Sequence, residues 1–371
     1  MTTSKPKKVA IVHDWLYGGG AELVVEQLHK LFPDAPIYTG YCSDAWRARL
    51  DDKVVTGWLQ HLGSGTLRKL AILPRLWWFR GLDLSAFDLV IISTGNGEAK
   101  AIRVPKSTTT ICYCHTPNHF YWRQYREYLK RPGFGLLNPL ARLGLKLFVG
   151  PLRRWDHRAA QRITHFIANS NHIKNDVKIY YGREAEVIHP PVDTARFAAA
   201  PETKRQGFIT ADRQVPAKHI DLIIEACNKI SAPLTVIGKG SEHENLKRLA
   251  GPSVTVIDRF VTDNELPAYF AGAQAFIKAS FEDFGVTPVE ALAAGTPVIA
   301  YQAGGALDYV KPGQTGVFFR EQTVDSLAQA LISFQPKLFK HEAIRAAATT
   351  FSPEAFRTHL QGYIAKHYKE K

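Results

Sequence analysis

The chain has 371 residues, more than one hydrophobic core usually supports, so two domains are expected. Apolar residues make up 45% of it and aromatic residues 11%, which excludes a disordered protein, and no apolar run approaches the ~20 residues of a membrane span. The net charge of +13 is unevenly spread: residues 1–190 hold 27 Lys and Arg against 15 Asp and Glu, or +12, whereas residues 191–371 hold 20 against 19, or +1. The basic excess therefore lies on the first half of the chain.

The polar, basic residues 1–8 lead directly into a strand, so no signal peptide is expected. The four cysteines follow no disulfide or zinc-site spacing, because Cys112 and Cys114 alternate along one strand and the other two are isolated. Both features favour a cytoplasmic protein.

Alternating strands and helices are predicted along the first half. A glycine loop, Tyr17-Gly18-Gly19-Gly20, joins the first strand to a helix over 21–31. The predicted strands are 8–13, 87–92, 109–114 and 165–169. Because these strands are continuously apolar and separated by helical segments, they indicate a parallel sheet covered on both faces.

The same pattern restarts after Pro190-Pro191, a pair that disfavours helix and cannot join a strand ladder. A helix is predicted over 220–230, and the strands of this half are 207–210, 233–238, 254–257, 275–277 and 297–300. The predicted fold class is α/β, with two doubly wound Rossmann-like domains over 1–190 and 191–351, and a C-terminal helix at about 352–371 that packs back on the first domain. Ligands of such sheets bind outside the carboxyl ends of the strands, so the site is expected in the cleft between the domains.

The most informative segment is 281–300, Phe-Glu-Asp-Phe-Gly-Val-Thr-Pro-Val-Glu-Ala-Leu-Ala-Ala-Gly-Thr-Pro-Val-Ile-Ala. Glu282 lies in a glycine-containing loop, and Glu290, eight positions later, is placed in the first turn of a helix. Two acids beside the unpaired amides of a helix N-terminus suit a ligand that combines a phosphate with several hydroxyls, such as a nucleotide sugar. Alternatively, Thr287 is the N-cap of a capping box that ends at Glu290, which would explain Glu290 without a ligand.

Two further groups are candidates for binding phosphate. Arg213 and Lys218, directly after the strand 207–210, could hold a diphosphate without metal and neutralise the charge on a leaving nucleoside diphosphate. A solvated basic turn is the alternative. The loop at Gly18 and Gly19 lets backbone amides approach an anion, but it lacks the spacing of a dinucleotide site and gives little support to a dehydrogenase.

His115 follows the strand 109–114 and is expected to face the ligand, with a core position as the alternative. His115 and His119 are spaced like metal ligands. Pro117 breaks the helix that such a pair needs and no Glu lies between them, so no metal site is expected.

Four motifs in register give the chain a family resemblance. They occur in the order seen in family 4 glycosyltransferases: His13-Asp14-Trp15-Leu16 with the glycine loop, Ile188-His189-Pro190-Pro191-Val192-Asp193, the pair Arg213 and Lys218, and the segment from Glu282 to Glu290. The chain resembles this family, retaining enzymes of the GT-B fold, over essentially its full length. Its opening His-Asp-Trp-Leu, its Gly-Gly-Ala-Glu and its Phe-Pro-Asp-Ala at 32–35 are similar to bacterial mannosyltransferases of polysaccharide assembly, which use GDP-mannose.

The resemblance implies roles for the matching side chains. Arg213 and Lys218 would hold the donor diphosphate. Glu282 would bind hydroxyls of the transferred sugar, and Glu290 the ribose hydroxyls. Asp212 departs from the family, in which Gly or Ser often precedes the arginine, and an acid there would weaken the diphosphate site unless it points away.

The resemblance also implies backbone contacts. Gly19, next to Gly18, would lie against the β-phosphate, and His115 would face the transferred sugar. Amides that would contact sugar and phosphate are those of Phe284, Gly285 and Val286.

The implied reaction retains the anomeric configuration and needs no metal, and no Asp-x-Asp motif occurs. The expected function is transfer of a hexose, mannose from GDP-mannose, to a lipid-linked glycan or polysaccharide acceptor in cell-envelope biosynthesis. The alternatives are a UDP-sugar donor (glucose, galactose or N-acetylglucosamine), a sugar-nucleotide 2-epimerase, and a non-catalytic sugar-nucleotide-binding protein.

The basic excess predicts an anionic membrane surface as partner. Segment 103–162 holds 12 basic and 2 acidic residues, or +10. Segments 67–80, 121–131 and 140–149 mix aliphatic or aromatic residues with Lys and Arg, as do helices that lie in a lipid interface. With about 1 kcal/mol from each basic residue, we expect a peripheral protein that docks its N-terminal domain on the inner face of the cell membrane. Nucleic acid is not expected because no motif for it occurs, and a solvated basic face is the alternative.

Overall fold

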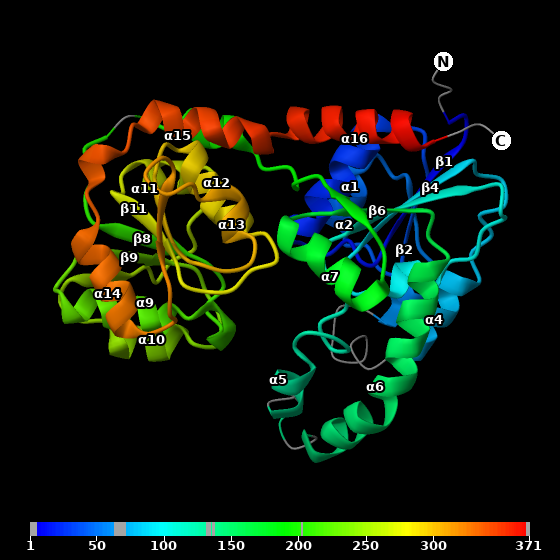
Figure 1. Ribbon diagram of the computed structural model, residues 1–371, viewed down its shortest axis with the longest axis horizontal. Coiled ribbons are helices and arrows are strands. Elements are labelled where there is room, and N and C mark those ends of the chain that lie inside the picture. The colour runs from blue at the N-terminus through cyan, green and yellow to red at the C-terminus, as the bar shows by residue number, and fades with distance from the viewer. Residues whose placement is uncertain (1–5, 63–71, 131–134, 136–137, 202, 369–371) are drawn as a thin grey trace. The chain divides into compact units, whose positions relative to one another are not determined.

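A computed structural model describes residues 6–62, 72–130, 135, 138–201 and 203–368. The chain divides into two compact units. Unit 1 comprises Met1–Pro190 and Arg357–Lys371, and unit 2 comprises Pro191–Phe356. Each unit contains one parallel sheet (Figure 1). The prediction of two doubly wound α/β sheets is confirmed.

Unit 1 is built on a seven-stranded sheet of order β3-β2-β1-β4-β5-β6-β7. The strands are β1 (Val9–His13), β2 (Ile37–Thr39), β3 (Val54–Val55), β4 (Leu89–Thr94), β5 (Thr109–Cys114), β6 (His165–Ala168) and β7 (Ala185–Val187). Ile11 of β1 pairs with Ile37 on one side and with Ile91 on the other, and all three are fully buried. The continuous burial of β1, β4 and β5 explains why their sequences are apolar without alternation.

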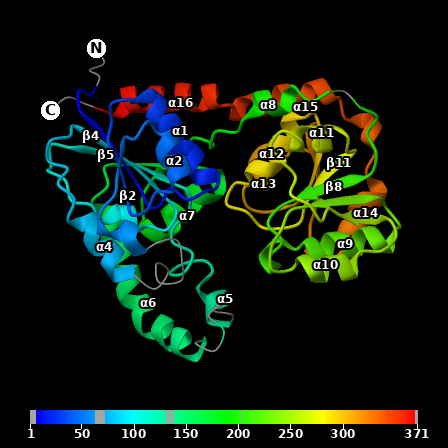
Figure 2. The ribbon, with the colours of Figure 1, turned by 180° about the vertical axis from the view of Figure 1, so that it is seen from behind.

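Helices cover this sheet on both faces (Figures 1 and 2). The helices of unit 1 are α1 (Gly20–Leu31), α2 (Asp44–Arg49), α4 (Ile72–Arg80), α5 (Tyr125–Lys130), α6 (Asn138–Gln161), α7 (Asn171–Tyr181) and the end of α16 (Pro353–His367), with 3-10 turns η1 (Trp58–Leu62) and η2 (Glu98–Ala101), and all but α5 and the first half of α6 lie over the sheet. The end of α16 packs on unit 1, where Tyr363 Oη donates to Phe166 O over 3.2 Å. Helix α5 and the first half of α6 extend beyond the sheet (Figures 1 and 2).

Unit 2 has a six-stranded sheet of order β10-β9-β8-β11-β12-β13. The strands are β8 (Phe208–Ala211), β9 (Leu234–Ile237), β10 (Val254–Val256), β11 (Ala275–Lys278), β12 (Val298–Tyr301) and β13 (Gly316–Phe319). The strand order reverses between β8 and β11, because β9 and β10 lie to one side and β12 and β13 to the other. Such a reversal opens a crevice at the carboxyl ends of the two central strands.

Two groups of helices enclose the second sheet (Figure 1). One face is covered by α9 (Ile220–Lys229), α10 (His243–Leu249) and α14 (Val324–Ser333). The other face carries α8 (Thr194–Ala198), α11 (Leu266–Ala271), α12 (Val286–Ala293) and α15 (His341–Ala348). The remaining short elements are α13 (Ala306–Tyr309), η4 (Pro216–Lys218), η5 (Pro336–Leu338) and η6 (Thr349–Phe351).

The structure bears on the predictions about membrane-spanning and interfacial segments. No helix in the described ranges combines the length and hydropathy needed to cross a bilayer. Of the three predicted interfacial segments, residues 67–71 and 131 lie outside the described residues. Tyr121 is only 2% exposed, and Trp122 stacks on Tyr180 with ring centroids 4.9 Å apart, so segment 121–131 does not present these two rings on the surface as expected.

Candidate active site

Several of the predicted site residues of unit 2 follow the carboxyl ends of its two central strands, β8 and β11. Strands β8 and β11 pair in register, with Ala275 opposite Phe208 and Phe276 opposite Ile209. Their carboxyl ends therefore lie side by side. Asp212 and Arg213 follow β8, and the loop to Glu282 follows β11.

Four charged side chains meet at this point. Lys218, at the end of η4, places Nζ 2.6 Å from Glu282 Oε1 and 3.3 Å from Asp212 Oδ2. Lys278, the last residue of β11, places Nζ 2.9 Å from the same Glu282 oxygen and also donates to Asp212 Oδ2. Ser280 Oγ completes the shell of Glu282 with a hydrogen bond of 2.8 Å. We call Asp212, Lys218, Lys278 and Glu282 the charge cluster.

Within the charge cluster, Glu282 and Lys278 each favour the charged form of the other. Burial raises the pKa of Glu282, but the ammonium groups of Lys278 and Lys218 outweigh it and lower that pKa to about 2. Burial lowers the pKa of Lys278, and the carboxylates of Glu282 and Asp212 outweigh it and raise that pKa above its usual value. The cluster pairs two basic with two acidic side chains, so a phosphate at Lys218 would compete with Glu282 and Asp212 for its ammonium group.

Arg213 differs from Lys218 because its charge is not neutralised. Its side chain is exposed, and within the described residues its guanidinium forms no ion pair or side-chain hydrogen bond. The Arg213 amide donates to Asp212 Oδ1 over 2.7 Å, which fixes the backbone at this turn. Arg213 is thus the cation at this edge whose charge is available to a phosphate group.

Helix α12 begins earlier than the capping box predicts. Gly285 is the N-cap, with φ 95° in the left-handed region, and Val286 is the first helical residue. The capping-box alternative, with Thr287 as N-cap, is therefore wrong. The expectation that Glu290 lies in the first turn is also wrong, because Glu290 lies in the second turn, where it cannot reach back to the cap. Glycine at 285 permits the early start, because a residue with a Cβ is strained at this φ and that Cβ would lie 3.0 Å from Tyr309 Oη.

The loop before α12 is held by its backbone. Gly305 N donates to Glu282 O over 2.9 Å, and a Cβ on Gly305 would come within 2.3 Å of Phe284 O. The Phe284 ring is buried against Tyr309 and Phe351, with centroids 5.8 and 5.7 Å away, so only its backbone can meet a ligand. The buried Tyr309 hydroxyl has no hydrogen-bond partner among the described residues. It is a polar group beside the N-terminus of α12 that sequence reasoning missed.

Among the described residues of unit 2, Glu290 is an acid whose pKa is raised. Its side chain is 15% exposed, and the Arg196 guanidinium on α8 lies 3.7 Å away. Burial raises the pKa of Glu290 to about 7, Arg196 acts against this, and the carboxylates of Asp263 and Asp193 add to it. Once ionised, such a carboxyl presents acceptors alone and can take a hydrogen bond from a hydroxyl on each oxygen, whereas the protonated form carries a donor at one oxygen.

In unit 1, the carboxyl ends of β1, β4 and β5 bring His13, Ser93 and His115 together. His13 Nδ1 lies 2.8 Å from Ser93 O and 3.1 Å from Ser93 Oγ, and Ser93 Oγ lies 2.8 Å from His115 Nε2. The His115 ring packs edge-on against Tyr113 at 5.0 Å. His115 directly follows its strand and is half-buried. The hydrogen bond from Ser93, which His13 contacts in turn, holds the His115 ring in place.

In the glycine loop of unit 1, the backbone amides already donate to a side-chain carboxyl group, that of Glu22. Gly18 N donates to Glu22 Oε1 over 2.9 Å, and Tyr17 N to the same oxygen over 3.3 Å. A Cβ on Gly19 would lie 3.0 Å from Glu22 Oε2. A phosphate at these two amides would have to displace the Glu22 carboxylate, which sequence reasoning did not foresee.

Asp14 organises the neighbouring turn. Its Oδ2 accepts from Thr94 Oγ1, Gly95 N and Asn96 N over 2.8 to 2.9 Å, and its Oδ1 accepts from Ala99 N over 2.9 Å.

All four cysteines are buried free thiols. Within the described residues, no group of three His, Cys, Asp or Glu side chains is arranged to hold a metal ion.

Two family models match the chain almost end to end. The model for Glycosyltransferase Family 4 matches residues 18–196, and the model for Glycosyl transferases group 1 matches residues 192–349. The chain belongs to the family 4 glycosyltransferases. Its two sheets form the GT-B fold.

Curated relatives match this glycosyltransferase over part of its length. A GDP-mannose-dependent alpha-(1-6)-phosphatidylinositol monomannoside mannosyltransferase of Mycolicibacterium smegmatis is 30% identical over 181 residues, which are 41% of this chain and 47% of the relative. The matched part thus spans about half the length of that relative. Solved structures match over nearly all of the chain.

One is HepE of Anabaena, in complex with UDP, with a TM-score of 0.68 and 17% identity over 97% of this chain and 100% of that chain. Another is sucrose-phosphate synthase from Thermosynechococcus elongatus, with a TM-score of 0.68 and 14% identity over 97% of this chain and 99% of that chain. At these identities the two structures show the fold of this glycosyltransferase and no more.

Proposed function

We propose that this family 4 glycosyltransferase transfers a hexose with retention from a nucleotide sugar, and that the donor is GDP-mannose. The observation that carries the proposal is the charge cluster at the ends of β8 and β11, with the free cation of Arg213 beside it. The 30% identical relative, a GDP-mannose-dependent mannosyltransferase, supports mannose and guanine as the sugar and base.

The side chains of unit 2 suit the departure of a nucleoside diphosphate. The bond between the anomeric carbon and the β-phosphate oxygen breaks, and negative charge grows on the diphosphate. Arg213 and the N-terminus of α12, which carries unpaired amides and the positive end of the helix dipole, would stabilise that charge. The acceptor oxygen then bonds to the anomeric carbon on the same face, and its proton goes to a phosphate oxygen.

The two acids would take different parts of the donor. Glu282 is held as a carboxylate by Lys218 and Lys278, so it can accept hydrogen bonds from hydroxyls of the transferred sugar and is not free to act as a nucleophile. Glu290, on the second turn of α12, would take the ribose hydroxyls. The amides of Phe284, Gly285 and Val286 would contact sugar and phosphate. Gly18, Gly19 and His115 of unit 1 stay predicted donor contacts.

Donor release tests this proposal. The purified protein is assayed with GDP-mannose, UDP-glucose, UDP-galactose and UDP-N-acetylglucosamine, with and without a chelator. We expect GDP release from GDP-mannose, unchanged by the chelator, and almost none from Arg213→Ala. Preferred release of UDP would overturn the mannose assignment, release of UDP with an epimerised free sugar would indicate a 2-epimerase, and binding without turnover on any acceptor would indicate a non-catalytic protein.

The acceptor is proposed to be a lipid-linked glycan or polysaccharide, with the protein peripheral on the inner face of the membrane. Two helices of unit 1 support docking there. On α4, Leu73 and Trp77 are 68% and 75% exposed, and on α6, Leu140, Leu143 and Leu147 are 66%, 53% and 62% exposed. The spacing of each set places it on one helix face.

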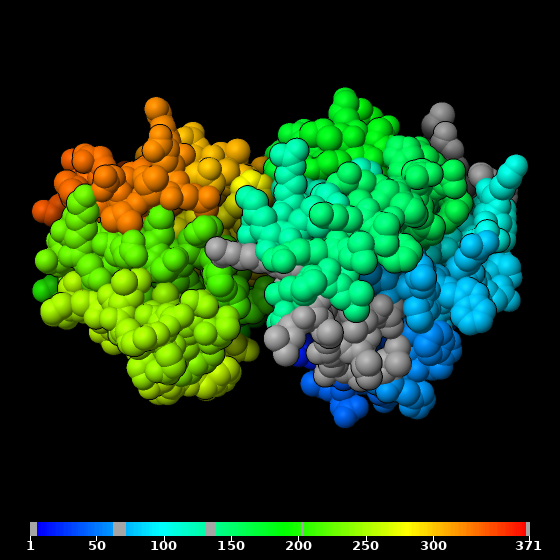
Figure 3. Space-filling model, turned by 90° about the horizontal axis from the view of Figure 1, so that it is seen from below, coloured from blue at the N-terminus to red at the C-terminus, as the bar shows by residue number. Residues whose placement is uncertain are grey.

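The segment that contains α5 and α6 is strongly basic in sequence. Segment 103–162 carries +10, and residues of α5 and α6 form a large part of the face shown in Figure 3. An apolar stripe on a basic helix suits the interface of an anionic bilayer.

A further inference from the structure

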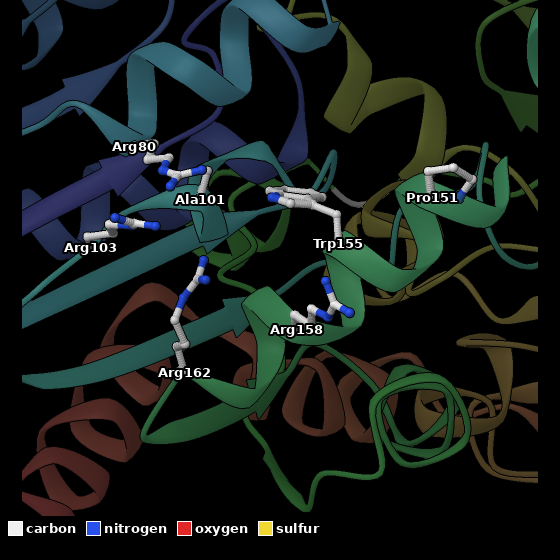
Figure 4. A pocket seen from close by; sticks show the side chains of 7 residues that line it. All are labelled: Arg80, Ala101, Arg103, Pro151, Trp155, Arg158 and Arg162. Carbon is white, nitrogen blue, oxygen red and sulfur yellow. The ribbon is translucent and has the colours of Figure 1, made fainter. Parts of the chain in front are cut away.

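A cavity in unit 1 is lined by four arginines. It measures about 230 Å³ and lies between the end of α4, the segment after η2 and the second half of α6. Arg80 comes from α4, Arg103 from the segment after η2, Arg158 from α6, and Arg162 directly follows α6. In Figure 4 the guanidinium groups of Arg80, Arg103 and Arg162 point into a common space beside the Trp155 ring.

The positive charge of this cavity is not neutralised by the protein. Within the described residues, none of the four arginines forms an ion pair or a side-chain hydrogen bond. Two acids on the elements that line the cavity pair with other basic residues. Glu98 of η2 lies 2.9 Å from Arg75, and Asp156 of α6 lies 2.8 Å from Lys100. Helix α4 itself contains no acid.

The arginines disfavour one another's charge. Burial lowers the pKa of Arg162, and the neighbouring charges of Arg103 and Arg80 lower it further. Holding like charges this close costs stability unless an anion neutralises them. The three guanidinium groups that point into the common space offer up to fifteen N–H donors in planar pairs, the geometry that fits phosphate oxygens.

We infer that this cavity is a binding site for a phosphate group, either a phosphomonoester or a diphosphate. Its volume is below the ~300–1,000 Å³ of ordinary small-molecule sites, so a phosphate group fits better than a whole nucleotide sugar. It is a second site, apart from the proposed donor site. Arg103 and Arg162 precede the amino ends of β5 and β6, whereas His115 and the glycine loop follow the carboxyl ends of strands.

The position of the cavity suggests where the phosphate comes from. Helix α4 carries both the exposed Trp77 and Arg80, and α6 carries both the exposed Leu147 and Arg158. A lipid phosphate would therefore lie on the same two helices whose apolar faces are proposed to enter the bilayer. This source rests on the proposed membrane docking, but phosphate binding itself does not.

Calorimetry with pyrophosphate tests the site. The parent protein for this test carries Arg213→Ala, because this substitution removes the proposed contact with the donor diphosphate. We compare it with the same chain carrying Arg103→Ala and Arg162→Ala, and with a matched control carrying Arg126→Ala and Arg154→Ala, two exposed arginines that do not line the cavity. We expect about tenfold or greater weakening for the first pair only, since a charged hydrogen bond is lost with each arginine.

The thermal midpoints of the variants keep the test interpretable. Arg103 and Arg162 are exposed and have no partners in the described residues. In the absence of anion the control pair should therefore melt as the parent does, and the cavity pair should melt at the same temperature or slightly higher because repulsion among the arginines is relieved. Equal affinity in all three proteins, or no pyrophosphate binding to the parent, would overturn the inference.

Flotation separates the two sources of phosphate. Vesicles of phosphatidylcholine with phosphatidic acid are compared with vesicles that carry phosphatidylserine at equal surface charge. A lipid source predicts that the cavity pair, unlike the control pair, loses the preference for phosphatidic acid. If calorimetry is positive and both pairs float alike, the ligand is a soluble phosphate. If the unaltered protein does not float at all, the proposed docking fails and the phosphate site stands.

Discussion

The ammonium group of Lys278 donates a hydrogen bond to the carboxylate of Asp212, although the two residues are 66 positions apart. They meet because β8 and β11 are neighbours in the sheet. From the sequence alone, Asp212 is an acid that weakens a diphosphate site. In the fold it is the counter-ion of a buried lysine, so its charge does not reach a ligand unopposed.

Removing Lys278 alone should destabilise unit 2. Lys278→Met leaves Asp212 and Glu282 short of a counter-ion in a largely buried place, and breaking a buried pair in this way typically costs about 3–5 kcal/mol. Chemical denaturation measures the change. The double variant Asp212→Ser with Lys278→Met should regain part of the loss, and an unchanged midpoint for the single variant would contradict the role of Lys278.

Arg213 and Lys218 should respond differently to substitution. Arg213→Ala should lower kcat roughly 100-fold or more, the scale for one electrostatic stabiliser of a transition state, and leave the melting temperature unchanged because Arg213 is exposed. Lys218→Ala should lower both, because Glu282 and Asp212 lose a partner. Steady-state kinetics and thermal melts on the same samples measure both effects. Full activity of Arg213→Ala would contradict the proposal that Arg213 stabilises the leaving diphosphate.

The pH dependence of donor binding should follow Glu290. Because its pKa is about 7, the carboxyl is protonated at pH 6 and ionised at pH 8. The KM for the donor should therefore fall as pH rises through 7, while in Glu290→Gln it should be higher and nearly independent of pH. A wild-type KM that does not change between pH 6 and 8 would count against a ribose contact from Glu290.

The free energy of unfolding should fall as pH rises through the pKa of Glu290, whereas donor binding should improve over the same range. A carboxyl whose folded-state pKa is raised from 4.5 to about 7 stabilises the fold most below pH 4.5, and this contribution is lost as pH rises through 7. Glu290→Gln should accordingly gain stability relative to the wild type between pH 5 and pH 8. Denaturation at these two pH values gives the comparison.

Some of this structure is predictable from sequence and some is not. Strand β5 is predicted to the residue because Thr109–Cys114 is long and wholly buried. Strand β3 escapes prediction because two residues carry no periodicity. The start of α12 is misplaced because Thr287 to Glu290 fits a capping box, and only the left-handed backbone of Gly285 shows that the helix begins earlier.

The candidate site is also only partly visible in the sequence. Glu282 and Lys218 stand out through their motifs. Lys278 does not, because a lysine that ends a strand looks like a solvated residue until the pairing of β8 with β11 places it beside Asp212. The arginine cavity is hidden for the same reason, since its four residues come from three separate segments.

Glu282→Gln should act mainly on turnover. The substitution keeps the shape of the side chain but removes the negative charge that balances Lys218 and Lys278. The sugar contact changes while the proposed nucleotide contacts stay, so kcat should fall, or discrimination among donor sugars should weaken, with little change in the affinity for free GDP. Affinity for GDP that falls as much as kcat would place Glu282 at the nucleotide instead.

The apolar face of α6 should determine membrane binding. Leu147→Asp places a charge where the proposed docking puts an aliphatic side chain in the bilayer, and burying one such side chain contributes about 1.5–3 kcal/mol. Flotation on vesicles with anionic lipid should therefore fall about tenfold or more. Ile179→Asp is the matched control, because Ile179 on α7 is 73% exposed, against 62% for Leu147, and lies outside the proposed face. If both variants float equally well, or if added salt does not reduce flotation of the wild type, this basic and apolar surface is solvated and the docking proposal is wrong.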